Sequence, residues 1–103
     1  MLFMRVIAKS TLVAFWTRHP ETETALQRWH AIVKVSDWRS TQDVLRTFPK
    51  AKAIDAQRIR FAVHGGDYRM IVAFDFVRQI AFVKFIGTHG DYDRVDATRI
   101  SLF

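Results

Sequence analysis

The sequence predicts a small α+β domain in which two N-terminal helices pack on an antiparallel sheet. Apolar side chains recur at helical spacing through the part of the chain before Pro49. From Gln57 onward the pattern changes to the period-two alternation of half-buried strands. Gly65-Gly66 separates two such runs and is typical of a two-residue hairpin turn. At 103 residues the chain has the length of one domain, so we expect residues 1–103 to form a single unit.

The segment before Pro20 predicts a strand and a helix. Met4 to Ala8 has a β-type composition and is expected to form an edge strand of the sheet. Ser10 can cap a helix, which ends at His19-Pro20 because the residue before proline avoids the helical region. The apolar stripe of this helix would consist of Leu12, Val13, Phe15 and Trp16.

Two further helices are expected before the sheet. The second begins at Glu21, where acidic residues suit the helix dipole, and continues towards Trp38. Its apolar positions are Ala25, Leu26, Trp29, Ile32 and Val33. A third, short helix is capped by Ser40, with Asp43 three residues on, and stops at Pro49. Lys50 to Ala56 is interpreted as a linker.

The strands after Gln57 place basic side chains on one face of the sheet. A two-residue turn at Gly65-Gly66 pairs His64 with Asp67, Ala62 with Arg69 and Arg60 with Ile71, and paired residues share a face. A second turn near Val77-Arg78 leads into the next strand. If that turn has two residues, Ile71 pairs with Lys84, which then joins the basic face; one more residue would send Lys84 to the other face. The side chains expected on this basic face are Arg58, Arg60, His64, Arg69 and Lys84.

The charge of the chain indicates an anionic partner. The net charge is +6 and the sequence pI is about 10.3, which suits nucleic acid, a membrane surface or an acidic protein. Cations gathered on one sheet face repel one another, which favours a role in binding an anion. Each arginine taken alone is more simply explained as a solvated strand residue than as a ligand contact, and only the arrangement of Arg58, Arg60 and Arg69 on one face favours the second reading.

Several classes of site are excluded by the sequence. The chain has no cysteine, and its histidines lack the spacing that places two metal ligands on one helical face. No phosphate-binding loop of the G-x-x-x-x-G-K-[ST] type occurs, so we expect neither a metal nor a cofactor. No apolar run is long enough to span a membrane, and Met1 to Met4 is too short for a signal peptide. We therefore expect a cytoplasmic protein without a membrane partner.

The segment Thr88 to Asp93 follows the last strand and holds two candidate functional residues. His89 is either a capping, hydrogen-bonding residue or a group that exchanges protons. Tyr92 could pack in the core, stack on a base or transfer a proton. Gly90 to Asp96 is expected to form a turn of helix, and Ala97 to Phe103 has no assignment.

Several runs, in the same order along the chain, resemble the HigB toxins of bacterial toxin-antitoxin pairs, within the wider RelE-like group of messenger-RNA-cleaving toxins. The most specific is T-H-x-x-Y-D at Thr88 to Asp93. One departure is Gly65-Gly66, where the family usually has G-N. The other matching runs are Phe15-Trp16, His19-Pro20, Trp29-His30, Trp38, Phe61 to Gly65, Tyr68-Arg69 and Val95-Asp96. The fold that the resemblance implies agrees with the α+β domain above.

The resemblance also implies an activity and partners. The reaction is endoribonucleolytic cleavage of messenger RNA, usually on the ribosome, by attack of the RNA's own 2′-hydroxyl on the adjacent phosphate. Arg69 is the residue expected to stabilise charge on the phosphate, with His89 as general acid or base and Tyr92 as its alternate or a stacking group. Arg58, Arg60, Lys84 and His64 are expected to bind RNA phosphates.

The partner that the resemblance implies is an antitoxin with a helix-turn-helix domain. The competing reading is a non-catalytic module whose basic face binds RNA without cutting it. A third is a decayed toxin that only docks an antitoxin through this face.

Overall fold

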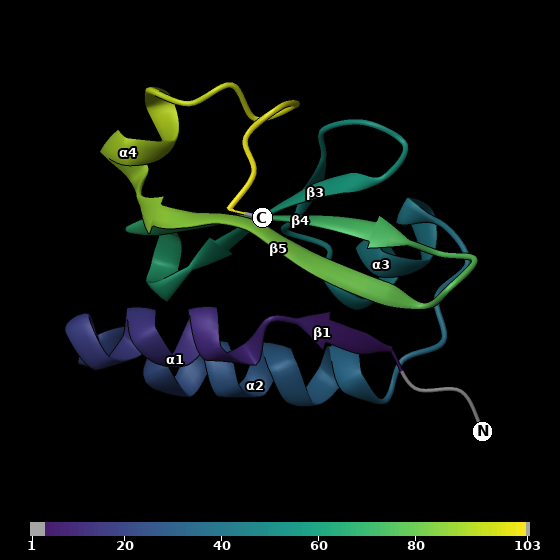
Figure 1. Ribbon diagram of the computed structural model, residues 1–103, viewed down its shortest axis with the longest axis horizontal. Helices are drawn as coiled ribbons and strands as arrows, with labels where there is room; N and C mark the ends of the chain where they lie inside the picture. Colours follow the sequence, from purple (N-terminus) through teal and green to yellow (C-terminus); the bar gives the residue numbers. More distant parts are fainter. Residues whose placement is uncertain (1–3, 103) are drawn as a thin grey trace.

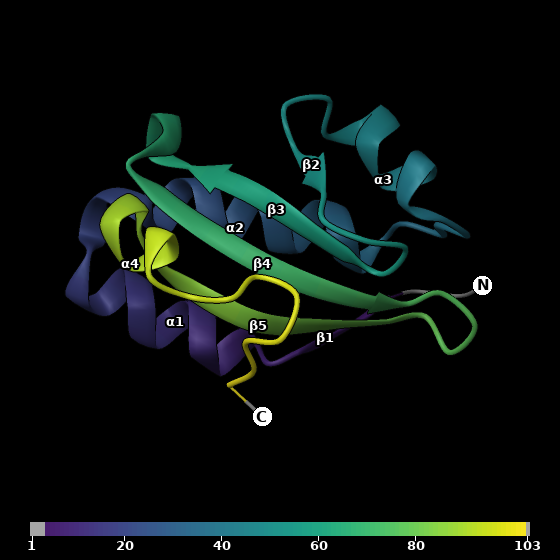
Figure 2. The same cartoon turned by 90° about the horizontal axis from the view of Figure 1, so that it is seen from above.

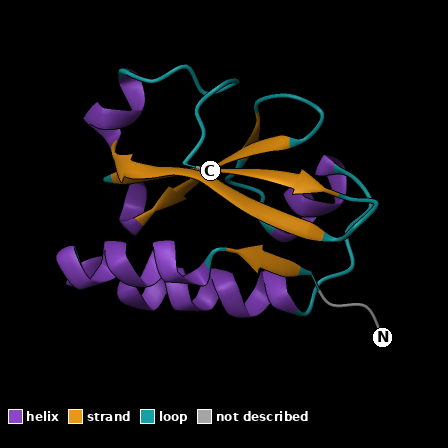
Figure 3. Cartoon of the chain, viewed as in Figure 1, coloured by secondary structure: helices purple, strands orange, loops and turns teal. Residues whose placement is uncertain are grey.

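The computed structural model describes residues 4–102. Of the segment Met1 to Met4, which is too short for a signal peptide, only Met4 lies within the described residues. Five strands form one sheet in the order β1-β5-β4-β3-β2. Helices α1 (Lys9–Arg18) and α2 (Glu23–Lys34) lie against one face, and α4 (His89–Asp93) with the C-terminal segment lies over the other (Figures 1 and 2). The predicted α+β class is confirmed (Figure 3).

The helical hairpin follows the sequence signals, with a shifted start in each helix. Helix α1 is preceded by Ala8, and Ser10 lies inside its first turn, so the predicted cap at Ser10 is wrong. The predicted end at His19 is confirmed. Helix α2 begins at Glu23 and not at Glu21, because Pro20–Thr22 forms a 3-10 turn, and it ends at Lys34.

The apolar stripes of the two helices are narrower than predicted. Leu12 and Phe15 of α1 and Leu26, Trp29 and Val33 of α2 are buried. Val13 and Ala25, which were placed in the stripes, are exposed. Both lie at the edges of their helical faces, where the spacing alone does not decide which residues contact the sheet.

The third helix confirms its predicted cap and end. Helix α3 (Thr41–Thr47) is capped by Ser40, whose side chain accepts a hydrogen bond from the Asp43 amide at 3.4 Å. It ends before Pro49. The predicted linker after it contains a short strand, β2 (Lys52–Ala53), which pairs with Arg60 and Ile59. The linker prediction is wrong at Lys52 and Ala53. These two residues form a strand because they pair with β3, a contact that their local sequence does not indicate.

The hairpin between β3 (Arg58–Val63) and β4 (Tyr68–Asp75) has the predicted register. Ala62 pairs with Arg69, and Arg60 pairs with Ile71. Gly65 and Gly66 have φ values of +66° and +97°, the left-handed region that a two-residue hairpin turn requires. Both expected strands are therefore confirmed, but the ladder ends at Val63 and Tyr68, so the expected pairing of His64 with Asp67 is wrong and both residues belong to the turn.

The pairing of β4 with β5 (Ile80–Thr88) follows the predicted register from Asp75 to Val72 and departs from it at Ile71. The loop has four residues, since Asp75 pairs with Ile80, and a bulge between Ile71 and Val72 makes Phe85 the partner of Ile71. The expected pairing of Ile71 with Lys84 is wrong. Lys84 is the extra residue of the bulge, and its ammonium lies 5.1 Å from the ring centre of Phe82, on the same face as Arg58.

The predicted edge strand is confirmed as β1 (Arg5–Ile7). It runs parallel to β5, so the sheet is mixed and only its other four strands are antiparallel. Between the sheet and the helices lies a core that includes Trp29, Trp38, Phe61 and Phe74. Among residues 4–102, no helix combines the length and the apolar composition that crossing a membrane requires.

Candidate active site

Two arginines of the basic face converge on one tyrosine. Arg60 of β3 and Arg69 of β4 lie on neighbouring strands, and their guanidinium carbons are 5.8 and 5.9 Å from the ring centre of Tyr92. Both distances permit cation–π contact. The Nε atoms of both arginines are buried and have no hydrogen-bond partner among the described residues. Two positive charges therefore lie side by side, and among residues 4–102 no carboxylate forms an ion pair with either arginine.

The local sequence of the loop after β5 fixes the position of Tyr92. The Thr88 hydroxyl accepts a hydrogen bond from the Asp91 amide at 3.0 Å, and the Asp91 carboxylate accepts one from the Thr88 amide at 3.2 Å. This capping box starts α4, and Asp91 also pairs with Arg94 at 2.6 Å. The hydrogen bonds from Thr88, followed by Arg94, hold the pKa of Asp91 below its ordinary value.

The floor below Tyr92 is formed by Phe85 and Gly87. The Tyr92 ring lies 6.3 Å from that of Phe85, centre to centre. A Cβ atom at Gly87 would lie 2.8 Å from the Phe85 ring and 3.1 Å from Asp91, so a side chain there would displace the Phe85 ring. Glycine at this position lets α4 lie close to β4. Arg69 of β4 is the residue that pairs with Gly87.

His89 is the first residue of α4 and directly follows Thr88, the last residue of β5. Its amide donates to the Asp67 carbonyl at 3.0 Å, and its Nδ1 atom lies 3.2 Å from Asp93 Oδ2. The contact with Asp93 orients the ring and leaves Nε2 on the opposite edge. Tyr92 follows His89 by three residues in the helix, which places both on a similar side of α4. The contact of His89 with Asp93 was not predicted, although the spacing of four residues within one helix is a sequence signal for such a pair.

Arg58 and Lys84 lie further along the same face, beneath the C-terminal segment. Arg58 Nη1 donates to the carbonyls of Ala97 and Ile100 at 3.0 and 2.8 Å, and Lys84 Nζ lies 3.4 Å from Ser101 Oγ. Figure 2 shows this segment crossing the strands. The C-terminal segment therefore covers this end of the basic face. Nothing in the local sequence of the tail indicates the contact, because it joins residues about forty positions apart.

A hollow of about 360 Å³ remains beside the covered part. It is lined by Arg58, Arg78, Lys84 and Phe82, together with Asp75. The Asp75 carboxylate is engaged by the amide and guanidinium of Arg78, which lower its pKa. Three cations around one carboxylate leave this hollow positive.

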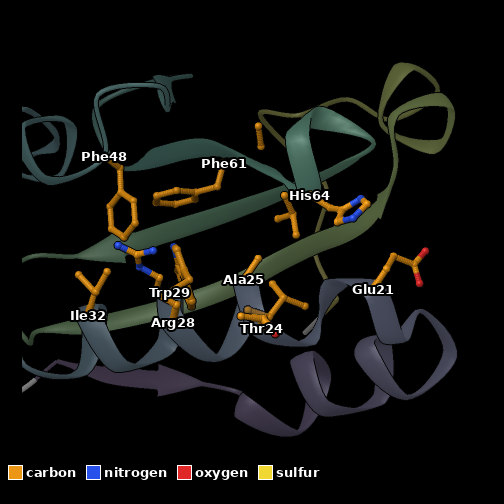
Figure 4. A pocket seen from close by; sticks show the side chains of 12 residues that line it. Glu21, Thr24, Ala25, Arg28, Trp29, Ile32, Phe48, Phe61 and His64 are labelled. Carbon is orange, nitrogen blue, oxygen red and sulfur yellow. The ribbon is translucent and has the colours of Figure 1, made fainter.

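His64 is not brought to the arginines. Its φ of +53° turns the residue out of the β3 ladder, and its Nδ1 lies 3.1 Å from Asp67. Its ring is 6.4 Å from that of Tyr68, and it lines a groove on the helix side of the sheet (Figure 4). The predicted placement of His64 on the basic face is wrong because strand alternation stops at Val63.

A second polar cluster lies on this helix side. The Tyr68 hydroxyl donates to the Glu21 carboxylate and lies 3.3 Å from His19 Nδ1. The bond to Glu21 raises the pKa of Tyr68, and the same bond lowers the pKa of Glu21. It connects the turn before α2 to the sheet. Among residues 4–102, no three histidine, aspartate or glutamate side chains are grouped so that they could hold a metal ion.

Most of the chain matches one known protein family. Residues 22–95 match the HigB toxin family, described as the RelE-like toxic component of a toxin-antitoxin system. The chain belongs to this family. A relative from Escherichia coli O6:H1 (strain CFT073), named mRNA interferase HigB, is 24% identical over 94 residues, which cover 89% of this chain and 91% of the relative. The matched range contains Arg60, Arg69, His89 and Tyr92, but ends before the tail residues that contact Arg58.

Proposed function

We propose that this chain is an endoribonuclease toxin that cleaves messenger RNA bound to the ribosome. The family supports the toxic role, and the name of the E. coli relative supports cleavage of messenger RNA. The observation that carries the assignment to this face is the pair of arginines around Tyr92, next to His89. Two guanidinium groups without a carboxylate partner are suited to an oligoanion.

The scissile phosphate is placed at Arg69 and Arg60. Each guanidinium can donate two parallel hydrogen bonds to phosphate oxygens from its terminal nitrogen atoms. Because the groups are held by neighbouring strands and by the Tyr92 ring, they need little rearrangement as charge builds up on phosphorus. Lys84 and Arg58 then bind phosphates further along the RNA.

The reaction is an internal transfer of the phosphate ester. The 2′ oxygen loses its proton to a general base and bonds to phosphorus, while the bond from phosphorus to the 5′ oxygen of the next nucleotide breaks. A general acid gives that 5′ oxygen a proton. The products are a 2′,3′-cyclic phosphate and a 5′-hydroxyl, so no water, metal or cofactor is consumed in this step.

His89 is proposed to carry one of these two protons. An imidazole can serve as a general acid or base, and Asp93 at 3.2 Å orients the ring of His89 as carboxylates orient histidines in other general acid–base sites. Tyr92 supplies a ring on which a neighbouring base can stack, and its hydroxyl is the alternate proton-transfer group. Arg60 and Arg69 lie close to this ring, so phosphate binding by the arginines and base stacking or proton transfer by Tyr92 can occur in one site.

A protein partner follows from the family. A toxin-antitoxin system contains an antitoxin that neutralises the toxic component, and we propose that here it carries a helix-turn-helix domain. Messenger RNA on ribosomes and this antitoxin are both cytoplasmic. The proposal therefore includes a cytoplasmic location for the chain.

The test is single-turnover cleavage of a messenger RNA on programmed ribosomes, with the purified chain. We expect cleavage products that end in a 2′,3′-cyclic phosphate. Binding to ribosomes with a steep salt dependence and no product would instead support the non-catalytic RNA-binding module. Cleavage that survives simultaneous replacement of Arg69 and His89 by alanine would place the active site elsewhere.

A further inference from the structure

The outer edge of β3 is only half covered. Strand β2 pairs with Arg60 and Ile59 and has no further residues, whereas β3 continues to Val63. Since β3 ends the sheet beyond β2, its last three residues have no strand on that side within the described part of the chain. An uncovered strand edge is a template for pairing with another chain.

The direction of the backbone identifies Ala62 as the uncovered position. The Arg58 carbonyl accepts hydrogen bonds from the Ile54 and Asp55 amides, so it faces this outer edge. Alternate residues of a strand direct their backbone groups to the same side, which places the N–H and C=O of Arg60 and Ala62 on this edge too. Arg60 pairs with Lys52, but Ala62 pairs only with Arg69 on the inner side.

A groove runs along this edge. A hollow of about 410 Å³ separates α2 from β3 and is lined mainly by apolar side chains, including Trp29, Ile32 and Phe61 (Figure 4). A second hollow of about 300 Å³ lies on the other side of Phe48, and both are lined by Phe61 and Ala62. The two hollows are therefore neighbours along the uncovered part of β3.

The groove contains an unused hydrogen-bond donor. Trp29 is 5% exposed and lines the larger hollow. Its indole Nε1 is buried without a hydrogen-bond partner among residues 4–102. A buried indole N–H normally has a hydrogen-bond partner. An acceptor from another molecule that reaches Trp29 would therefore satisfy this donor.

The rim of the groove is cationic. Arg28 lines the larger hollow, Lys50 lines the smaller one, and Lys52 lies on the adjoining strand β2. The carboxylate on this rim, Glu21, already accepts a hydrogen bond from Tyr68. A partner that fits must combine apolar side chains with carboxylates. RNA does not meet this requirement, because the lining offers little polar surface to its phosphates.

We propose that an extended, acidic and apolar segment of the antitoxin adds to the sheet as a strand along β3 at Ala62. The proposal rests on the proposed function, because that function provides the antitoxin. Backbone hydrogen bonds to Ala62 give the segment its register, and alternate side chains enter the groove beside Trp29. Its carboxylates face Arg28, Lys50 and Lys52. The groove lies on the opposite side of the sheet from Tyr92, whereas the side chains that alternate with those in the groove lie on the same face as Arg60.

The test compares two alanines of α2. Ala25 lines the groove and Ala31 does not, yet both are exposed on the same helix. The probe is the protein encoded by the reading frame next to the gene of this chain, titrated calorimetrically into wild type, Ala25→Arg and Ala31→Arg. We expect Ala25→Arg to weaken binding about 10- to 100-fold and Ala31→Arg to change it less than about twofold. Arginine is a good helix former, so neither variant should lose its fold.

Hydrogen exchange supplies the second measurement. The Ala62 amide of the wild-type chain should exchange rapidly alone and slowly in the complex. Equal affinity of all three chains, or an Ala62 amide that stays unprotected, would overturn the proposal, as would failure of the probe to bind. Protection of Ala62 at high concentration of the chain alone would assign the edge to a second copy instead.

Cleavage separates this proposal from the proposed function. Ala25→Arg should cut ribosome-bound messenger RNA at the wild-type rate, because Ala25 lies on the helix side of the sheet. If the chain cuts RNA but Ala25→Arg binds the probe normally, only the docking proposal fails. If no variant cuts RNA but the probe binds at the groove, only the catalytic proposal fails.

Discussion

Arg69 and Arg58 have the same side chain on the same sheet face, but their surroundings differ. The guanidinium of Arg58 donates to two backbone carbonyls of the tail, whereas the Nε of Arg69 is buried without a partner among the described residues. A guanidinium that is already hydrogen-bonded must exchange those partners for phosphate. Arg69 can bind phosphate without that exchange, which is why the catalytic prediction concerns this residue.

Replacement of Arg69 by alanine should lower the single-turnover cleavage rate about 10²–10³-fold, the usual cost of removing one donor to a developing charge. Arg69→Lys should restore little activity because the ammonium lacks the planar fork. Arg46→Ala is the matched control, since Arg46 is exposed on α3 and, within the described part of the chain, forms an ion pair only with Asp43. Wild-type cleavage by Arg69→Ala would exclude this role, and circular dichroism checks the fold of each variant.

His89 is predicted to affect the rate and not the affinity. His89→Ala should slow cleavage by about 10²–10⁴-fold, as loss of a general acid or base does, while ribosome binding stays close to wild type. Asp93→Asn should give a smaller loss, because it keeps the imidazole but weakens the contact that orients it. The measurement is the single-turnover rate from pH 5 to 9. An unchanged rate for His89→Ala would transfer the role to the Tyr92 hydroxyl.

At the scale of elements, we expect the C-terminal segment to compete with RNA for the basic face. Ending the chain after Asp96 removes the carbonyls that bind Arg58 and the hydroxyl near Lys84. Affinity for single-stranded RNA should then rise. The slope of log affinity against log salt should steepen by roughly 1.4, from about 0.7 per added phosphate contact. Weaker binding by the shortened chain would show that the tail itself contacts RNA.

The capping box of α4 gives a prediction about acid stability. The pKa of Asp91 is lowered by its hydrogen bonds with Thr88 and its pairing with Arg94, so the carboxylate is favoured in the folded state. Its contribution is complete above the unfolded value of about 3.9 and is lost as the pH falls through the lower folded value. The difference in Tm between wild type and Asp91→Asn should therefore be constant from pH 7 to about 5 and shrink below about 4. A difference that is independent of pH would contradict the role of Asp91 as a charged cap.

At the scale of the whole molecule, the net charge of +6 and the site together predict toxicity. Expression of the chain alone in bacteria should stop growth and translation. The double variant Arg60→Ala, Arg69→Ala should permit growth at the same level of folded protein. Normal growth with soluble wild-type chain present would count strongly against the toxin proposal.

Much of the fold could be predicted because its signals are local. Gly65-Gly66 set the hairpin register, Pro20 and Pro49 ended helices, and Ser40 capped α3, since each depends on allowed backbone angles or on hydrogen bonds within a few residues. The placement of arginines on one face followed from the period of the strand. The sequence by itself therefore determined the fold class and the chemical character of the basic face.

The tertiary structure alone decided which of these residues meet. Strand β2, the bulge that carries Lys84 and the tail over Arg58 all depend on partners far away in the sequence. His64 left the predicted face because a positive φ at the turn interrupted the alternation. The contact of Tyr92 with both arginines required α4 to fold back over Gly87. Local patterns fix which side of an element a residue occupies, but only packing between elements fixes its neighbours.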